Sequence, residues 1–341
     1  MSAPPTRPAR VAIVIPTFDG LGLLRPCLAA LDAQTYRDFA ITVVDDGSTD
    51  GTAAWLATAY PELRVIRHAR NRGLVAACNA GIAATASDLV CLLNNDTEAE
   101  PEWLGALVVA LDNAPGAGSV ASKMLLFERR DTLHSAGDGF TVTGVPINRG
   151  VWQSDHGQYD DVAPPFGPCA GAALYRRAAL LAIAEPDGAI LDPDLYMYCE
   201  DVDLAWRLQR AGYRCVFAPD ARIYHHLSAT GGGAFASYWV GRNLLLLLAK
   251  DLPRPLLRRY WPRIVATYAG RVWRAAHAWR GAEARATLRG MLAALPALPS
   301  FWRKGRRLAP PSASELARVD LLLLRPGGEH PTDPLQRTEA R

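Results

Sequence analysis

Carboxylate and amide side chains follow directly after an apolar run near residue 90. Five apolar residues, Leu89–Leu93, lead into Asn94, Asn95 and Asp96. A run of this length between polar residues is typical of a strand buried on both faces of a parallel sheet. Ligands bind at the carboxyl ends of such strands, and a carboxylate beside two amides can hold a divalent cation against a phosphate. A strand followed by an Asx turn and a helix N-cap would give the same pattern.

A second group of acidic residues lies at the predicted start of a helix. Glu200, Asp201 and Asp203 precede apolar residues at helical spacing, and Gly212 ends the pattern. In the first turn of a helix the dipole favours an ionised carboxylate, which suits Asp201 to act as a general base. Asp203 and Arg207 have the spacing of an ion pair along one helix face. The structural alternative is that these acids only charge a helix N-terminus.

The elements that would position these groups alternate between strand and helix. Such alternation indicates right-handed βαβ units and a parallel sheet, so the polar segments that follow the strands would gather along one sheet edge. Beyond residue 119 the pattern changes to further strands, a loop-rich stretch over 129–165 and the acidic helix. The patterns predict strands at 11–15, 40–44, 64–67, 89–93, 119–127, 167–175 and 213–217, and helices at 21–33, 52–59, 73–84 and 101–113.

Composition divides the chain into an acidic body and a basic end. Residues 1–250 carry 20 Lys and Arg against 27 Asp and Glu, a net charge of −7, whereas residues 251–341 carry 17 against 7, a net charge of +10. The six cysteines are scattered without a Cys-x-x-Cys pair, which is typical of buried thiols in a reducing cytosol. Neither a signal-peptide pattern nor a run of ~18 apolar residues is present, so we expect a cytoplasmic protein.

The basic end is helical in composition. Residues 261–298 mix Trp, Leu, Ile and Ala with Arg every three to five residues. This pattern is typical of amphipathic helices in a membrane interface and predicts peripheral binding to the anionic inner face of the cell membrane. A helical hairpin packed on the main domain with an Arg-rich solvent face would give the same pattern. Residues 308–341 are rich in proline and charge, which predicts disorder, although Leu321–Leu324 could dock.

Five motifs occur in a fixed order over roughly residues 10–250, and together they resemble those of the family 2 glycosyltransferases. Within that family the chain is most similar to bacterial rhamnosyltransferase-type enzymes of cell-wall and surface-polysaccharide assembly. The resemblance implies the GT-A fold, an α/β fold with a Rossmann-like, mostly parallel sheet and flanking helices. The motifs are Ile15-Pro-Thr-Phe-Asp19, Val43-Val-Asp-Asp-Gly-Ser-Thr-Asp-Gly-Thr52, Asn71-Arg-Gly73 with Asn79-Ala-Gly81, Leu92-Leu-Asn-Asn-Asp-Thr97 and Glu200-Asp-Val-Asp-Leu204.

The resemblance and the composition together predict four segments. They are a flexible N-terminus at 1–9, a GT-A catalytic domain at 10–235, a basic helical membrane-proximal region at 236–307 and a disordered tail at 308–341. Within the catalytic domain, residues 10–118 would form the nucleotide-binding half and residues 119–235 the acceptor half.

The activity that the resemblance implies is an inverting glycosyl transfer. A sugar, with L-rhamnose as a candidate, would pass from a dTDP- or UDP-sugar to a hydroxyl of a lipid-linked or surface glycan. Such a transfer needs one carboxylate base, for which Asp201 is the first candidate and Glu200 the second. A metal and cationic donors would handle the leaving diphosphate.

Other functions have weaker support. A non-catalytic nucleotide- or glycan-binding scaffold is favoured by the amides of Asn94 and Asn95, because the family's usual D-x-D motif begins with a carboxylate. A sugar nucleotidyltransferase would need a basic, glycine-rich loop to bind a triphosphate, and residues 16–22 contain no basic side chain. The motifs of a nucleic-acid-binding protein are missing.

The resemblance assigns a nucleotide-sugar pocket to side chains that follow the first four strands. Asp46 would accept the imide N–H of uracil or thymine, or it could shape the turn at Gly47 together with Asp45. Arg72 could donate to a diphosphate or remain solvated. Asn79 could bind the ligand or bond the protein backbone. The assigned residues are Pro16, Thr17, Asp19, Asp46, Arg72, Asn79 and Asn95.

The metal site that the resemblance implies would hold Mg²⁺ or Mn²⁺ between Asp96 and His225. His226 would replace His225 if the register shifted by one residue, and a purely structural histidine is the other alternative. One carboxylate, one imidazole and the diphosphate oxygens should bind such an ion only loosely unless the nucleotide is present.

Overall fold

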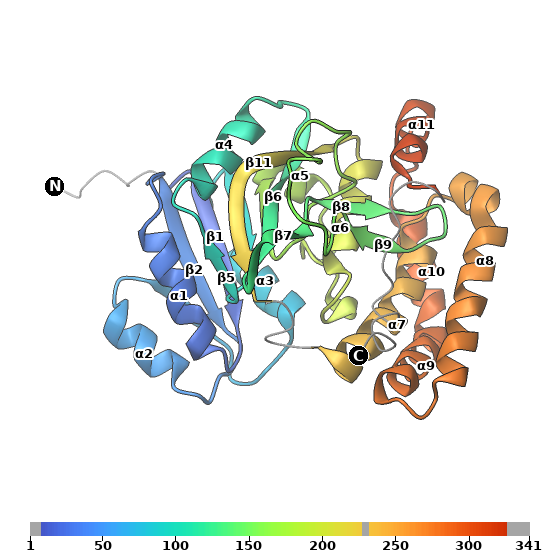
Figure 1. Ribbon diagram of the computed structural model, residues 1–341, viewed down its shortest axis with the longest axis horizontal. Coiled ribbons are helices and arrows are strands. Elements are labelled where there is room, and N and C mark those ends of the chain that lie inside the picture. The colour runs from blue at the N-terminus through green and yellow to red at the C-terminus, as the bar shows by residue number, and fades with distance from the viewer. Residues whose placement is uncertain (1–7, 227–231, 326–341) are drawn as a thin grey trace.

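A nine-stranded sheet with helices on both faces forms the centre of the computed structural model, which describes residues 8–226 and 232–325 (Figure 1). Strand β7 (Arg129–Ser135) pairs with β6 outside the main path of the sheet. The strand order is β3 (Arg64–Arg67), β2 (Phe39–Asp45), β1 (Val11–Thr17), β4 (Leu89–Leu93), β10 (Ala172–Arg176), β6 (Ala117–Leu126), β11 (Arg214–His225) and β5 (Thr97–Ala99).

The first half of the sheet is parallel, as predicted. Strand β1 lies between β2 and β4, with Thr17 in register with Asp45 and Val14 in register with Leu92. The carboxyl ends of these strands therefore lie side by side. Alternate β1 residues enter the two core layers on opposite faces of the sheet. The connecting helices are α1 (Leu21–Asp32), α2 (Thr52–Ala59), α3 (Leu74–Ala83) and α4 (Trp103–Asp112).

The second half of the sheet brings distant segments to the same edge. Strand β10 is antiparallel to β4 and β6, and the backbone N–H of Asn94 donates to the carbonyl of Gly171, which directly precedes β10. Strand β11 is longer than predicted, because Pro219 and Asp220, which resemble a turn, occupy an irregularity in its pairing with β6. Beyond it β11 runs antiparallel to β5 and places His225 opposite Thr97.

Short elements cover this edge. Strands β8 (Asp138–Phe140) and β9 (Pro146–Asn148) form a hairpin from the segment predicted as loop-rich, and α5 (Arg177–Ala182) follows β10. A turn of 3₁₀ helix at Pro193–Leu195 leads to α6 (Glu200–Arg210), which is the predicted acidic helix.

Helices after residue 232 pack into the same core as the sheet. Leu247, Tyr260 and Phe301 are buried in the hydrophobic cluster that also contains Trp206 of α6. Two of these helices, those that contain Tyr238 and Gly290, pack backbone against backbone. A Cβ on Gly290 would collide with the carbonyl of Tyr238, so only glycine permits this close approach. The helices are α7 (Gly233–Lys250), α8 (Arg254–His277), α9 (Ala282–Ala294) and α10 (Leu298–Arg307). None of the described helices is both long and apolar enough to cross a bilayer.

The prediction of disorder over 308–341 is wrong for its first part. Helix α11 (Ala313–Leu322) begins at a capping box formed by Ser312 and Glu315, and it buries Val319. Leu324 then bridges to Thr141 near the β8–β9 hairpin, so the docking segment considered in the sequence does contact the main domain. Residues 1–7 and 326–341, which include most of the predicted flexible N-terminus and the rest of the tail, lie outside the described residues.

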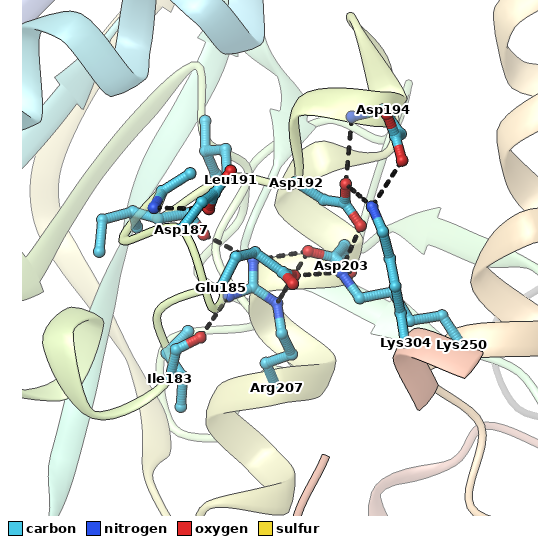
Figure 2. Close-up of polar contacts among 12 residues, drawn as sticks. Ile183, Glu185, Asp187, Leu191, Asp192, Asp194, Asp203, Arg207, Lys250 and Lys304 are labelled. Carbon is cyan, nitrogen blue, oxygen red and sulfur yellow. Dashed lines mark hydrogen bonds and ion pairs between the residues drawn. The ribbon is translucent and has the colours of Figure 1, made fainter. Parts of the chain in front are cut away.

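A buried ionic cluster joins α6 to the C-terminal helices (Figure 2). The predicted pair of Asp203 and Arg207 is confirmed, with Oδ2 and Nη2 2.6 Å apart. The Lys250 ammonium of α7 lies 2.6–2.7 Å from carboxylate oxygens of Glu185, Asp192 and Asp203. These three carboxylates are close enough together to bind a metal, but the ammonium already supplies their cation.

Candidate active site

A cavity of about 780 Å³ opens at the carboxyl ends of β1, β2 and β4. The segment before α6 and the loop before β10 close it from the other side. Of the residues predicted for the site, the lining contains Pro16, Thr17, Asp46, Asn95, Asp96, Glu200, Asp201 and His225. The fold therefore brings groups from the first 100 residues together with groups that lie 100 residues further along the chain.

Thr17 and Asn95 form a buried pair at the end of β1. The Asn95 amide donates to Thr17 Oγ1 over 2.9 Å. Gly20 leaves space for this amide, since a Cβ at position 20 would collide with it. The pair joins the ends of β1 and β4 at the cavity wall.

Asp46 lines the cavity and also orders the loop after β3. Its carboxylate accepts hydrogen bonds from the backbone N–H groups of Arg72 and Gly73, and it lies 2.6 Å from His68 Nδ1. Asp45 makes the turn contact that was the alternative for this pair, because its Oδ1 accepts from the Ser48 N–H over 2.8 Å. The expected contact of Asp46 with a nucleotide base stays a prediction.

Three of the predicted binding residues are not part of the described cavity lining. Asp19 accepts from the Thr49 N–H over 2.6 Å and so fixes the neighbouring turn. Arg72 has an exposed side chain, whose contact with a diphosphate stays a prediction. Asn79 bonds the backbone of Ile190 and Leu191 over 2.8–3.1 Å, which is the internal alternative considered from the sequence.

Asp96 and His225 face each other inside the cavity. Asp96 Oδ1 lies 3.2 Å from His225 Nε2, and both side chains are buried. An octahedral ion with bonds of about 2.1 Å holds neighbouring ligand atoms roughly 3 Å apart, so this spacing fits a divalent cation. His225 Nδ1 has no hydrogen-bond partner among the described residues. His226, the alternative ligand, instead stacks on Phe127 and lies 3.4 Å from Glu98.

Glu200 and Asp201 begin α6 at the opposite wall. The Asp201 carboxylate accepts from the backbone N–H of Val202 over 2.8 Å and from that of Ala170 over 3.4 Å, and burial raises its pKa. Burial and the neighbouring Asp201 raise the pKa of Glu200 to about 8. Glu200 Oε2 has no hydrogen-bond partner in the described chain. Both acids are therefore available to a ligand in the cavity.

Sequence reasoning did not assign a role to Asp138. Carboxylate oxygens of Asp138 and Asp201 and the sulfur of Cys169 lie within 4.8 Å of one another. Burial and the charge of Asp201 raise the pKa of Asp138 well above its usual range. Asp138 belongs to a segment without a motif, and only the folding of β7 and β8 brings it to α6.

A family model described as glycosyl transferase family 2 matches residues 12–182, which is half of the chain. The chain belongs to glycosyl transferase family 2. As a member it is a glycosyltransferase, and the prediction of this family from five ordered motifs is confirmed.

The alignments with two relatives cover different shares of those proteins. The chain is 30% identical over 232 residues to the uncharacterized protein y4gI of Sinorhizobium fredii. That alignment covers 65% of this chain but only 25% of y4gI. It is 28% identical over 248 residues to the N-acetylglucosaminyl-diphospho-decaprenol L-rhamnosyltransferase of Mycobacterium tuberculosis H37Rv. That alignment covers 66% of this chain and 79% of the rhamnosyltransferase.

A solved structure supports the fold. The mannosyltransferase PcManGT of Pyrobaculum calidifontis, in complex with GDP-Man and Mn²⁺, superposes with a TM-score of 0.53 at 17% identity. The match covers 93% of this chain and 85% of that protein. The GT-A fold predicted from the motifs is therefore confirmed.

Proposed function

We propose that this glycosyltransferase inverts the anomeric centre of a dTDP- or UDP-sugar, with L-rhamnose as the first candidate, and transfers the sugar to a hydroxyl of a lipid-linked or surface glycan. The observation that carries the proposal is one cavity with two chemically different walls. Thr17, Asp46 and Asp96 line one wall, whereas Glu200 and Asp201 begin the helix at the other. A nucleotide diphosphate and an acceptor hydroxyl could then approach the sugar from opposite sides.

Asp201 acts in this proposal as the general base. Its ionised carboxylate takes the proton of the acceptor hydroxyl while the hydroxyl oxygen attacks the anomeric carbon, and the bond from that carbon to the diphosphate oxygen breaks. The N–H groups of Ala170 and Val202 hold the carboxylate in place. The raised pKa of Asp138, caused by burial and the charge of Asp201, favours Asp201 as the ionised member of the pair. A single base with no second acid suits an inverting transfer.

Asp96 and His225 are the residues that would hold Mg²⁺ or Mn²⁺. Such an ion would stabilise the negative charge of the leaving diphosphate. The 3.2 Å spacing of their facing atoms and the mixed oxygen and nitrogen donor set support this assignment. The Mn²⁺ in the PcManGT complex is further support for a divalent ion in this fold.

The choice of donor and acceptor is supported by relatives. The rhamnosyltransferase of M. tuberculosis is named for L-rhamnose and for a diphospho-decaprenol carrier, and PcManGT was solved with a nucleotide sugar. We therefore place dTDP-rhamnose first among donors and a lipid-linked diphosphate glycan first among acceptors.

A panel of donors tests this function. We expect wild type to hydrolyse one of dTDP-rhamnose, UDP-galactofuranose, UDP-glucose and UDP-N-acetylglucosamine in the presence of Mn²⁺. Removing the ion with EDTA, or replacing Asp96 by alanine, should reduce turnover at least about 10²-fold, because the charge on the leaving diphosphate loses its cation. Hydrolysis measured by release of dTDP or UDP is the readout. No turnover and no calorimetric binding of any donor would favour the non-catalytic scaffold instead.

We also propose that the outer face of α8 binds an anionic membrane surface. Trp261 and Trp273 are 56% and 62% exposed on this helix, and exposed arginines flank them. The inner face of the same helix packs Tyr260 and Ile264 into the core, so the indoles are free to contact lipid. Arginines near an anionic bilayer contribute ~1 kcal/mol each, and indole rings favour the headgroup region.

Vesicle binding tests the membrane proposal. Replacing both Trp261 and Trp273 by glutamate should lower the affinity for phosphatidylglycerol-containing vesicles at least about tenfold, because apolar contact is lost and negative charge is added. Replacing Val109 by glutamate is the matched control, since it is 58% exposed on α4 at the other end of the molecule (Figure 1). Equal sedimentation of wild type and the double variant would exclude this face as the binding surface.

A further inference from the structure

The segment that leads into α6 has an unfavourable backbone. Tyr196, Tyr198 and Cys199 have φ angles of 64°, 64° and 66°, in the left-handed region that side chains disfavour. These residues line the cavity, and Cys199 directly precedes Glu200. Strained backbone of this kind persists only where surrounding contacts hold it.

A buried amide of α7 supplies those contacts. The Asn243 side chain is fully buried, and the two N–H groups on its Nδ2 serve three carbonyl groups of the strained segment, so one N–H is shared between two carbonyls. The distances are 3.0 Å to Leu195, 2.9 Å to Met197 and 2.8 Å to Tyr198. The carbonyl of Tyr196 accepts from the Val75 N–H of α3 over 3.0 Å, and that of Cys199 accepts from the Asp203 N–H within α6. Four carbonyl groups of the strained segment thus find donors on α3 and α7.

From this geometry we infer that Asn243 is a positioning residue for catalysis: its amide holds the turn at 195–199 so that Glu200 and Asp201 face the cavity. The inference rests on the proposed role of Asp201 as the base. An amide suits this position because it offers two N–H donors to carbonyl oxygens. An aspartate would place acceptor oxygens against the carbonyls, and an alanine would leave them unpaired in a buried site.

The contribution of α7 is geometric, since Asn243 itself does not line the cavity in the described chain. A shift of the turn by about 1 Å can reduce catalysis by roughly 10²-fold without changing ligand contacts elsewhere. The residues proposed for the nucleotide side follow β1, β2 and β4, whereas the hydrogen bonds of this amide go to residues 195–198. The turn reaches that side through Tyr196, which contacts Asn71 and Val75 and keeps the Val75 N–H as a donor when Asn243 is replaced. Loss of Asn243 should therefore separate catalysis from nucleotide binding.

The test compares full-length Asn243→Ala and Asn243→Asp with wild type. We expect kcat for the donor that wild type hydrolyses to fall about 10- to 100-fold, while KM for the donor and calorimetric binding of dTDP or UDP with Mn²⁺ change less than about twofold. Gln34→Ala is the matched control, because Gln34 is also a fully buried amide that bonds backbone groups, those of Ala30 in α1, Glu100 and Leu104 in α4. It should lower thermal stability but leave kcat unchanged.

A second substitution tests whether strain is the reason. Glycine adopts positive φ without a steric penalty. Cys199→Gly in the Asn243→Ala background should therefore recover at least about a third of the decrease in log kcat that Asn243→Ala causes. Failure of this rescue, or an equal fall of kcat in Gln34→Ala, would reduce Asn243 to a general stabilising residue and overturn the inference.

Hydrogen exchange separates this inference from the proposed function. Asn243→Ala should lose amide protection at 196–203 and Gln34→Ala should not. If wild type hydrolyses no donor, the proposed function fails, and the exchange pattern still decides whether Asn243 orders the turn. Unchanged protection at 196–203 in Asn243→Ala would overturn the positioning role whatever the activity of wild type.

Discussion

Replacing Asp201 by asparagine is expected to lower kcat for glycosyl transfer by about 10²–10⁴-fold, which is the usual contribution of a positioned general base. The amide keeps the shape of the side chain, and its single oxygen can still accept from the Val202 N–H, which bonds one of the two carboxylate oxygens in wild type. It loses the acceptor for the Ala170 N–H, a long contact of 3.4 Å, and it cannot take the proton of the acceptor hydroxyl. Nucleotide binding should persist, because Asp201 lies on α6 and not on the strands that form the nucleotide side. Transfer rate and calorimetric nucleotide binding are the two measurements.

Glu200→Gln is the control for this assignment. Its carboxyl group also lines the cavity, but burial and the charge of Asp201 raise its pKa to about 8, so much of it is protonated at neutral pH. We expect Glu200→Gln to lose less than about tenfold in kcat. A large loss in Glu200→Gln together with an active Asp201→Asn would reassign the base to Glu200.

The pH dependence of wild type should report the same base. Burial raises the pKa of Asp201, and a base works only when ionised, so kcat should fall as the pH drops through this raised value. The acid limb of the kcat profile should therefore lie above the ordinary range of an aspartate. In Asp201→Asn the remaining activity should lose this limb. A residual profile with the limb of wild type would point to a different titrating group.

Replacing Lys250 by methionine is expected to destabilise the folded protein by ~3–5 kcal/mol, the cost of leaving buried charges without a partner. The ammonium is buried and contacts Glu185, Asp192 and Asp203. Although burial opposes it, Arg207 and Lys250 hold the pKa of Asp203 at about 2, so the carboxylate stays charged. Methionine fills similar space but supplies no cation. Urea unfolding at neutral pH is the measurement.

Lys304→Met provides the matched comparison. This lysine of α10 contacts Asp192 and Asp194 in the same cluster, but its side chain is 21% exposed. Water can then solvate part of the charge that remains, so we expect a smaller loss of stability than for Lys250→Met. Equal unfolding midpoints for Lys250→Met and wild type would contradict the view that this ammonium neutralises the cluster (Figure 2).

Local patterns in the sequence predict the sheet well where they are strong. The strands at Arg64–Arg67 and Leu89–Leu93 and the helix at Thr52–Ala59 have the predicted bounds, because their apolar runs and flanking polar residues are unambiguous. Strand β11 was predicted too short because proline and aspartate inside it resemble a turn. Helix α11 was missed because composition suggested disorder, whereas its cap and one buried face decide the outcome.

The residues of the candidate site also differ in whether a local sequence pattern identifies them. Motif residues such as Asp96 and Asp201 are recognisable because each follows a strand or begins a helix within a local pattern. Asp138 and Asn243 have no such signal: one lies in a loop-rich segment, and the other lies inside a leucine-rich helix. Their roles depend on contacts with distant segments, Asp138 with Cys169 and Asp201, and Asn243 with Tyr198, which only the folded chain defines.

The ionic cluster has a consequence for protein engineering. A chimaera could keep the sheet of this enzyme and take its C-terminal helices from a relative. Joining the two parts after residue 235 would separate charged groups that are paired in this protein. Lys250 of α7 and Lys304 of α10 contact the Asp192 carboxylate, which lies before residue 235, so foreign helices would have to bring two cations to the same places. The smallest unit that can be exchanged as a whole therefore extends at least to α10, and the exposed face of α8 is best altered by single substitutions.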